Sequence, residues 1–290
     1  MSADRPPPVV PSAFTARGHR LAYTEFGEGR RWVLLMPGLL IPALMQEHLA
    51  TALAASGAHV ITLDPLGHGR SDRPDSMAEY SIESFASDAI ALLDHLDVDE
   101  AVIGGTSLGA NVTLEIAHAA PRRVRGMIIE MPVLENALVA SVIAFGPLLV
   151  AMHFGERLMR PIAAGLRLIP RRVVPFWGNV ALDAVRQDPG PSAALLQGLF
   201  FSHIAPYSAQ RRELTMPALV IGHHIDPVHP FSDAGVLTDE LPHARLVEAS
   251  NILELRLRPE RLTAEIAGFV AECWSPRAVA KLRRQRRHTA

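Results

Sequence analysis

The sequence contains a single cysteine, Cys273, among its 290 residues. One cysteine cannot form an internal disulfide, which excludes a disulfide-stabilised secreted scaffold and favours a reducing compartment. Residues 1–12 also lack the apolar core of a signal peptide, since they include an acid and several prolines. We therefore expect a cytoplasmic protein that begins with a disordered lead-in at residues 1–15.

The chain carries little net charge, −2 at pH 7. No overall field therefore favours nucleic acid or acidic membranes as a partner. The exception is the C-terminus, where residues 277–290 hold six Lys and Arg and no acid, which leaves −8 on the remainder. We predict that residues 276–290 form a solvated basic tail, with docking on a partner as the alternative. The sequence does not indicate an oligomeric state.

Long hydrophobic runs are also missing. The run that most resembles a membrane span, residues 137–152, has 16 residues, and Gly146-Pro147 interrupts it. A transmembrane helix needs about 20 apolar residues. We predict no integral membrane span and a buried or pocket-lining segment here, with interfacial attachment as the alternative.

Almost half of the residues, 49%, are hydrophobic, which indicates a globular chain with a large core. Short apolar runs that suit buried strands alternate with helical patterns, and turn-rich loops separate them. Strands are predicted at 32–36, 59–63, 101–104, 124–130, 217–222 and 244–248, and helices at 48–56, 81–96, 108–120, 231–241 and 259–274. This alternation predicts an α/β fold with a mostly parallel, doubly wound sheet.

The alternation stops between residues 132 and about 210, where the sequence is helical, apolar and punctuated by proline. We predict an inserted helical cap on one domain of residues 16–275, whose core comprises 16–131 and 211–275. The insertion holds six Phe and Trp residues and few acids. An apolar cap favours a hydrophobic small-molecule ligand, although about half of these side chains must pack within the cap itself.

The strongest chemical signal is Gly105-Thr106-Ser107-Leu108-Gly109, which fits the pattern G-x-S-x-G. It follows a predicted strand and opens a predicted helix, the context of a nucleophile elbow. A serine on so cramped a turn needs small neighbours, and the helix N-terminus directs N–H groups toward developing negative charge. Ser107 is the candidate nucleophile, and a serine nucleophile indicates acyl chemistry.

With these motifs the chain resembles the α/β-hydrolase superfamily over nearly its whole length. "LLMPGLL" resembles the oxyanion loop of that family, "LDPLGHGRSDRP" the loop after the next strand, and "VIGHHIDPVHP" the strand and loop that carry the acid. The resemblance implies that Ser107 is the nucleophile and Asp226 the acid, with backbone N–H groups of Leu39 and Leu108 as the oxyanion hole. Haloalkane dehalogenases and epoxide hydrolases are excluded because they carry aspartate at the elbow.

The histidine that the resemblance implies is missing. It should follow the last strand, roughly seven or eight residues before the Arg258-Pro259 that opens the final helix. Asn251 and Ile252 occupy that position, and neither can take a proton at neutral pH. General-base help is worth about 10²–10⁴ in rate. Our hypothesis is that Asn251 and Ile252 mark a natural vacancy toward which Asp226 still points.

Four interpretations of this gap stay open. A histidine from elsewhere is one of them, either His229, His224 or His68, although each alone is more simply explained as a surface or loop-bracing residue. The others are chemistry that needs little base, a ligand-binding protein without activity, and an artificial substitution. No metal or cofactor is predicted, since the histidines around Asp226 lack the spacing of metal ligands. We predict a serine-dependent hydrolase of esters or related acyl compounds; the alternative is a non-hydrolytic binding protein, lyase or cyclase on this fold.

Overall fold

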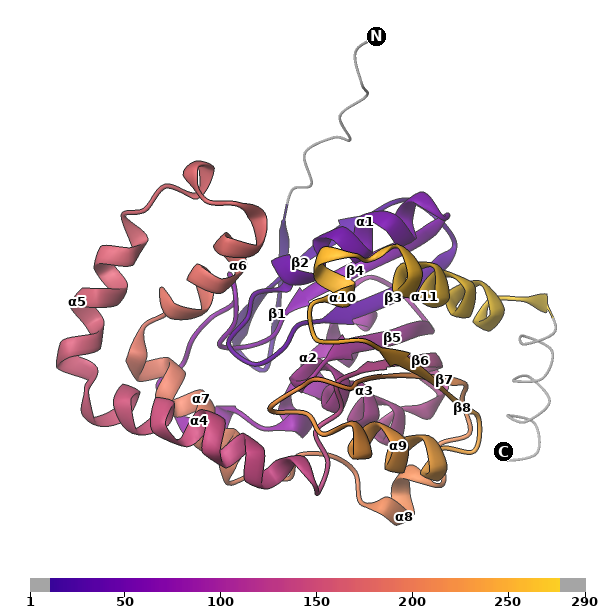
Figure 1. Ribbon diagram of the computed structural model, residues 1–290. Helices are drawn as coiled ribbons and strands as arrows, with labels where there is room; N and C mark the ends of the chain where they lie inside the picture. Colours follow the sequence, from indigo (N-terminus) through magenta and orange to yellow (C-terminus); the bar gives the residue numbers. More distant parts are fainter. Residues whose placement is uncertain (1–10, 277–290) are drawn as a thin grey trace, which may run out of the picture.

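The computed structural model describes residues 11–276, and eight strands in it form one sheet (Figure 1). The strand order is β1-β2-β4-β3-β5-β6-β7-β8. The strands are β1 (Ser12–Ala16), β2 (His19–Phe26), β3 (Arg31–Met36), β4 (Ala58–Asp64), β5 (Ala101–Thr106), β6 (Val124–Glu130), β7 (Ala218–His223) and β8 (Ala244–Ala249). The β1–β2 and β2–β4 pairs are antiparallel, and all later pairs are parallel. The predicted mostly parallel α/β sheet is confirmed.

Helices cover both faces of the sheet (Figure 1). They are α1 (Glu47–Ala55), α2 (Ile82–His95), α3 (Leu108–Ala119), α9 (Phe231–Glu240), α10 (Glu254–Leu257) and α11 (Glu260–Cys273). Along β5, Val102 belongs to the buried cluster that includes residues of α1 and α11, whereas Ile103 belongs to the cluster that includes residues of α2, α3 and α9. Because side chains alternate across a strand, an apolar run such as this one must be covered twice. The sheet is therefore doubly wound, as predicted.

The predicted disordered lead-in is wrong for residues 12–15. Strand β1 begins at Ser12 and pairs with β2 from Ser12–Tyr23 to Ala16–His19. The side chains of Phe14 and Ala16 are buried while their neighbours are exposed. This two-residue period places one face of β1 on the core, a signal that is easily missed in a five-residue strand. The rest of the lead-in and the basic tail at residues 277–290 lie outside the described residues.

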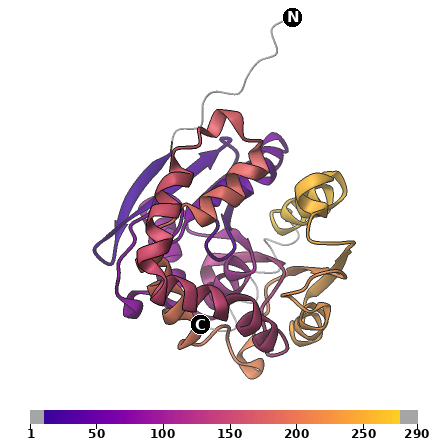
Figure 2. The same cartoon turned by 60° about the vertical axis from the view of Figure 1, so that its left-hand side comes forward.

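Between β6 and β7 the chain forms a helical insertion, residues 132–210, which stands to one side of the sheet (Figures 1 and 2). Its helices are α4 (Ala137–Phe154), α5 (Glu156–Arg167), α6 (Phe176–Val185), α7 (Pro189–Phe200) and α8 (Ser208–Arg211), which extends one residue past it. Helix α7 packs against α4 and reaches the segment that precedes α2. The insertion therefore extends over the ends of the parallel strands that carry the candidate site.

Helix α4 corrects one expectation and confirms part of another. The segment does not break at Gly146-Pro147, because α4 runs through Pro147 to Phe154. Of the predicted buried or pocket-lining roles, only the second is confirmed: 11% of the 18 residues of α4 are buried, and several of its side chains line a pocket. By length and composition alone, α4 is the one helix among residues 11–276 that satisfies the criteria for a membrane span. One such helix is weak evidence for a span.

Candidate active site

Ser107 occupies the sharp turn between β5 and α3. Its backbone has φ 53° and ψ −109°, a conformation that residues with a Cβ rarely adopt. Two glycines allow the turn: a Cβ on Gly105 would lie 2.4 Å from the backbone of Gly109, and one on Gly109 would lie 2.5 Å from the carbonyl oxygen of Met36. The predicted small neighbours are thus a steric requirement, and the turn projects Ser107 into a pocket.

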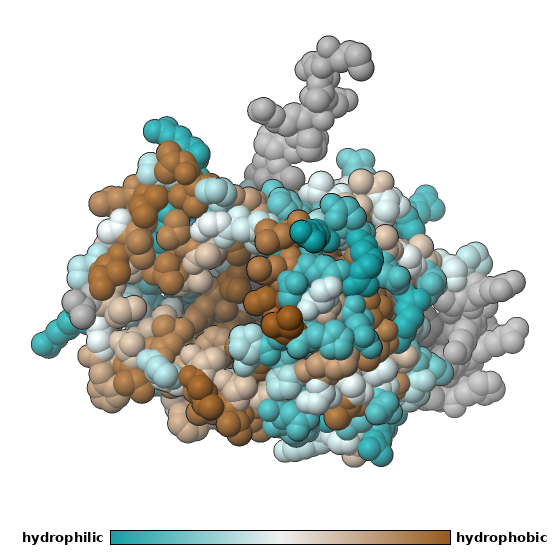
Figure 3. All heavy atoms as spheres, viewed as in Figure 1, coloured by the Kyte–Doolittle hydropathy of each residue, from teal (hydrophilic) through white to brown (hydrophobic). Residues whose placement is uncertain are grey.

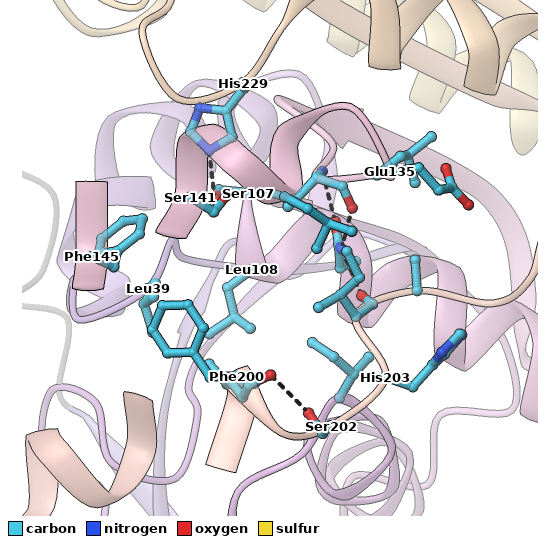
Figure 4. A pocket seen from close by; sticks show the side chains of 18 of the residues that line it. Leu39, Ser107, Leu108, Glu135, Ser141, Phe145, Phe200, Ser202, His203 and His229 are labelled. Carbon is cyan, nitrogen blue, oxygen red and sulfur yellow. Dashed lines mark hydrogen bonds between the residues drawn. The ribbon is translucent and has the colours of Figure 1, made fainter. Parts of the chain in front are cut away.

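The Ser107 hydroxyl meets His229, not residue 251 or 252. Ser107 Oγ lies 2.8 Å from His229 Nε2 (Figure 4). On the other side of the ring, His229 Nδ1 lies 2.9 Å from Asp226 Oδ2. With the proton of neutral His229 on Nδ1, that nitrogen donates to the Asp226 carboxylate. Nε2 is then free to accept the hydroxyl hydrogen of Ser107. These three side chains have the connectivity of a serine–histidine–aspartate triad.

Asp226 holds His229 through the loop that contains both residues. Its Oδ1 accepts the backbone N–H groups of Val228 at 2.8 Å and His229 at 2.9 Å. The Asp226 side chain thereby stabilises a tight turn over residues 226–229. Burial works to raise the pKa of Asp226, but the hydrogen bonds from His229 and Val228 outweigh it and the pKa lies below its ordinary value. Asp226 is therefore ionised at neutral pH, and it fixes both the backbone and the ring of His229.

The other two candidate histidines lie away from Ser107. The exposed ring of His224 stacks on Phe231, and its Nε2 pairs with Glu248 at 3.0 Å. His68 is fully buried. Its Nε2 accepts the N–H of Leu40 at 3.0 Å and its Nδ1 donates to the carbonyl of Leu66 at 3.0 Å. With both ring nitrogens occupied, His68 braces the loop beside the elbow.

His68 makes the stability of the fold depend on pH. Burial disfavours the charged ring and, with the nearby charge of Arg73, lowers the pKa of His68 to about 4. Between an unfolded pKa of about 6.5 and this value, only the unfolded chain binds the proton, so the free energy of unfolding falls as pH decreases. Between pH 7 and pH 4.5, protonation of this histidine in the unfolded chain should lower the free energy of unfolding by about 2 to 3 kcal/mol.

Urea unfolding at both pH values measures this contribution. His68→Gln keeps an acceptor for the N–H of Leu40 but cannot titrate, so its loss of stability between the two pH values should be smaller by that amount. Because every other titrating group is common to both proteins, equal losses in the two would refute the assignment.

The position predicted for the histidine has a structural role instead. The Asn251 carbonyl accepts a hydrogen bond from His223 Nδ1 at 2.8 Å, and its side-chain Oδ1 accepts the N–H of Leu253 at 2.9 Å. The hypothesis that Asp226 points toward this position is wrong, because both carboxylate oxygens are used within the loop of residues 226–229. His229, three residues after Asp226, lies between Asp226 and Ser107. The loop after β8 therefore does not need to supply a histidine.

That loop leads instead to a buried ion pair behind the elbow, which sequence reasoning missed. Arg256 Nη2 lies 2.7 Å from Glu130 Oε2, and the same oxygen accepts the hydroxyl of Thr106 at 2.5 Å. The backbone carbonyl of Glu130 also accepts the N–H of Ser107 at 2.8 Å. The one available signal was an acid ending a strand that is otherwise apolar. Glu130, held by Arg256, therefore anchors both Thr106 and Ser107.

Charge pairing sets the ionisation of this cluster. Burial works to raise the pKa of Glu130, but Arg256 and His223 outweigh it and lower the value to about 2. Burial likewise works to lower the pKa of His223, yet the contact with Glu130 leaves it above the ordinary value. Glu130 is therefore an anion at neutral pH, neutralised by the cation of Arg256.

The two predicted oxyanion donors flank Ser107. Leu108 is the first residue of α3, so its N–H lies in the first turn, where a helix offers no backbone acceptor. Leu39 lines the same pocket as Ser107, and a Cβ built on the preceding Gly38 would lie 3.9 Å from the Ser107 Cβ. The positive end of the α3 dipole adds to the field at the hydroxyl.

The pocket above Ser107 has a volume of about 510 Å³ and is lined mainly by apolar side chains (Figure 4). Helix α4 contributes Leu138, Val142 and Phe145, and α7 contributes Leu196 and Phe200. The remaining lining residues include polar groups: Asn111, Glu135, Ser141, Ser202, His203, Tyr207 and Arg211. Such a site, mostly apolar with a few polar groups, suits a small hydrophobic molecule.

Comparison with known proteins agrees with this fold. A family model described as "alpha/beta hydrolase fold" matches residues 31–148, from β3 into α4. In this segment and in its sheet topology, the chain has the α/β-hydrolase fold. The crystal structure of the enol-lactonase from Burkholderia xenovorans LB400 superimposes with a TM-score of 0.72 at 20% identity, covering 90% of this chain and all of that one.

Two curated relatives match across most of this chain. The 3-oxoadipate enol-lactonase 2 of Acinetobacter baylyi is 26% identical over 253 residues, which cover 82% of this chain and 88% of that protein. Rhodomycin D methylesterase DauP of Streptomyces sp. strain C5 is 28% identical over 248 residues, covering 76% and 83%. Both names denote cleavage of an ester bond, the lactone being a cyclic ester.

Proposed function

We propose that this chain is a serine hydrolase of carboxylic esters in which His229 replaces the histidine missing after the last strand. The observation that carries the proposal is the contact of Ser107 Oγ with His229 Nε2 at 2.8 Å, with Asp226 on the opposite ring nitrogen. The ester-cleaving relatives support the reaction type. A binding protein would have no need for the strained backbone of Ser107.

In the acylation half of the reaction, Ser107 Oγ attacks the carbonyl carbon of the ester while His229 Nε2 takes its proton. The carbonyl oxygen becomes an oxyanion, which the N–H groups of Leu39 and Leu108 stabilise. Collapse of this intermediate breaks the bond to the leaving oxygen. His229 gives its proton to that oxygen, and the alcohol departs from a Ser107 ester.

In the second half, His229 takes a proton from a water molecule that attacks the carbonyl carbon of the acyl group on Ser107. The second tetrahedral intermediate uses the same two N–H donors. When it collapses, the proton returns to Ser107 Oγ and the carboxylic acid leaves. Asp226 stays ionised throughout and stabilises the imidazolium that forms in each half, consistent with its lowered pKa.

The apolar pocket predicts a preference for medium-length or cyclic hydrophobic acyl groups. Each CH₂ that enters such a site contributes about 0.8 kcal/mol, or roughly fourfold. From p-nitrophenyl acetate to p-nitrophenyl hexanoate, kcat/KM should therefore increase by at least about tenfold. A steady decrease from acetate onward would contradict the pocket assignment.

Two neighbouring phenylalanines provide a matched control. Phe200 lines the pocket, whereas Phe201 is 81% exposed. Phe200→Ala should lower kcat/KM for the hexanoate more than for the acetate, and Phe201→Ala should leave both within about twofold. Equal effects of the two substitutions would remove the pocket as the basis of chain-length preference.

A further inference from the structure

Helix α4 is apolar on every side, yet only 11% of its 18 residues are buried within the protein. A helix of this composition is normally enclosed by a core or by lipid. Its inner face has an explanation, because Leu138, Val142 and Phe145 line the pocket over Ser107. The outer face has none within the described chain, so the question is what covers it.

The outer face of α4 is a stripe of large side chains. Val139, Ile143, Val150 and Phe154 are 69%, 70%, 56% and 81% exposed. At about 100° per residue, their spacing of 4, 7 and 4 residues places them on one side of the helix, opposite the side that packs on α7. Gly146 and Pro147 lie on the same side and add no charge. We call these four side chains the outer stripe.

The adjoining segment extends this surface with apolar and basic residues. Ile162, Leu168 and Val173, in α5 and just after it, are 49%, 82% and 66% exposed. Helices α4 and α5 both lie at the front of the molecule in Figure 2, and hydrophobic side chains gather over the insertion in Figure 3. Contiguous exposure on this scale marks an interaction surface.

The charges around this surface are predominantly positive. Residues 137–175 contain five arginines and one acid, which gives the segment a net charge of +4. The arginines, at positions 157, 160, 167, 171 and 172, are all exposed. Arg160 pairs with Asp188 and Arg171 with Asp183, both from outside the segment. The whole stretch from residue 137 to 188 still has six arginines against three acids.

We propose that the outer stripe and the arginines of residues 157–172 dock on an anionic lipid bilayer. Apolar side chains beside a row of arginines are the pattern of interfacial helices, in which the apolar side enters the acyl region and the cations meet lipid phosphates. A second copy of this chain fits less well. A twofold interface would bring two like-charged faces of +4 together.

Docking in this orientation places α4 between the bilayer and the pocket over Ser107. The same helix then has lipid on its outer face and the apolar site on its inner face. If the chain hydrolyses hydrophobic esters, as proposed above, such substrates would reach it from the membrane. The docking itself does not rest on that activity and is measured without substrate.

The test is co-sedimentation of the full chain with vesicles of phosphatidylcholine alone or with about 30% phosphatidylglycerol. We expect binding to the anionic vesicles, weakening as salt rises from about 0.05 M to about 0.5 M. The double variant Val139→Ser/Ile143→Ser should bind at least about tenfold less tightly. Leu257→Ser, at an exposed apolar residue of α10, is the matched control and should bind like the wild type.

Circular dichroism and p-nitrophenyl acetate hydrolysis verify that the double variant is folded, since neither outer-stripe residue lines the pocket. The proposal is overturned if the wild-type protein does not co-sediment with anionic vesicles. It is also overturned if the double variant binds them as tightly as the wild type. A dimer in solution that the double variant dissolves would assign the stripe to a second copy instead. Vesicle binding without ester hydrolysis would refute the proposed function and leave the docking intact.

Discussion

Replacing His229 with alanine is expected to lower kcat/KM for an activated ester by at least about 10⁴-fold. His229 Nε2 is 2.8 Å from Ser107 Oγ, and among the described residues no other histidine ring nitrogen forms a hydrogen bond with that oxygen. Without the imidazole, the hydroxyl keeps its proton and is a poor nucleophile. With an alkyl ester, the leaving alkoxide would also lose its proton donor. Steady-state kinetics on p-nitrophenyl hexanoate measure the effect.

Two companion variants make this result specific. His224→Ala removes an exposed imidazole five residues earlier and should change kcat/KM by less than about twofold. Asn251→His restores a histidine where the family resemblance implies one, but Asp226 is already committed to His229. We therefore expect no gain from it. A tenfold rise with Asn251→His, together with an active His229→Ala, would favour a vacant site over a rewired triad.

Replacing Ser107 with alanine is expected to lower kcat by about 10⁶-fold, to the level that the oxyanion donors and binding alone provide. The substitution removes the only atom that forms the acyl bond in the proposed reaction. Alanine removes just one oxygen from the strained turn, so the fold should persist. Circular dichroism and the urea midpoint check this.

The double variant Ser107→Ala/His229→Ala distinguishes a working triad from two separate defects. Groups that act as one unit are strongly non-additive, so the double variant should be no slower than Ser107→Ala alone. Independent effects would multiply instead. The double variant would then be a further 10⁴-fold slower than Ser107→Ala, which would show that His229 acts independently of Ser107. Single-turnover assays at high enzyme concentration reach these low rates.

The sheet and the serine were predictable because their signals are local. A strand, G-x-S-x-G and a helix follow one another directly, and the steric demand for small residues at positions 105 and 109 is visible in the sequence. Asp226 was placed by the family resemblance, which implies an acid in the loop after the strand at residues 217–222. Strand β1 was missed because a short edge strand carries only two buried side chains.

The base could not be assigned from the sequence because it depends on the path of one loop. Ser107 and His229 are 122 residues apart. The sequence offered three candidate histidines. The turn that Asp226 stabilises by accepting the N–H groups of residues 228 and 229 selects His229 among them. The ion pair of Glu130 and Arg256 was hidden for the same reason, since its partners are 126 residues apart. The exposure of α4 likewise depends on packing that composition does not determine.

The central claim, that His229 activates Ser107, is tested most directly by the rate at which a fluorophosphonate labels Ser107. Phosphonylation needs the nucleophile and its base but no knowledge of the natural substrate. Intact-protein mass spectrometry follows the added mass in wild type, His229→Ala and His224→Ala, with Ser107→Ala as the blank. The account predicts that His229→Ala is labelled at least about 100-fold more slowly while His224→Ala matches the wild type. Labelling of His229→Ala at the wild-type rate would contradict it.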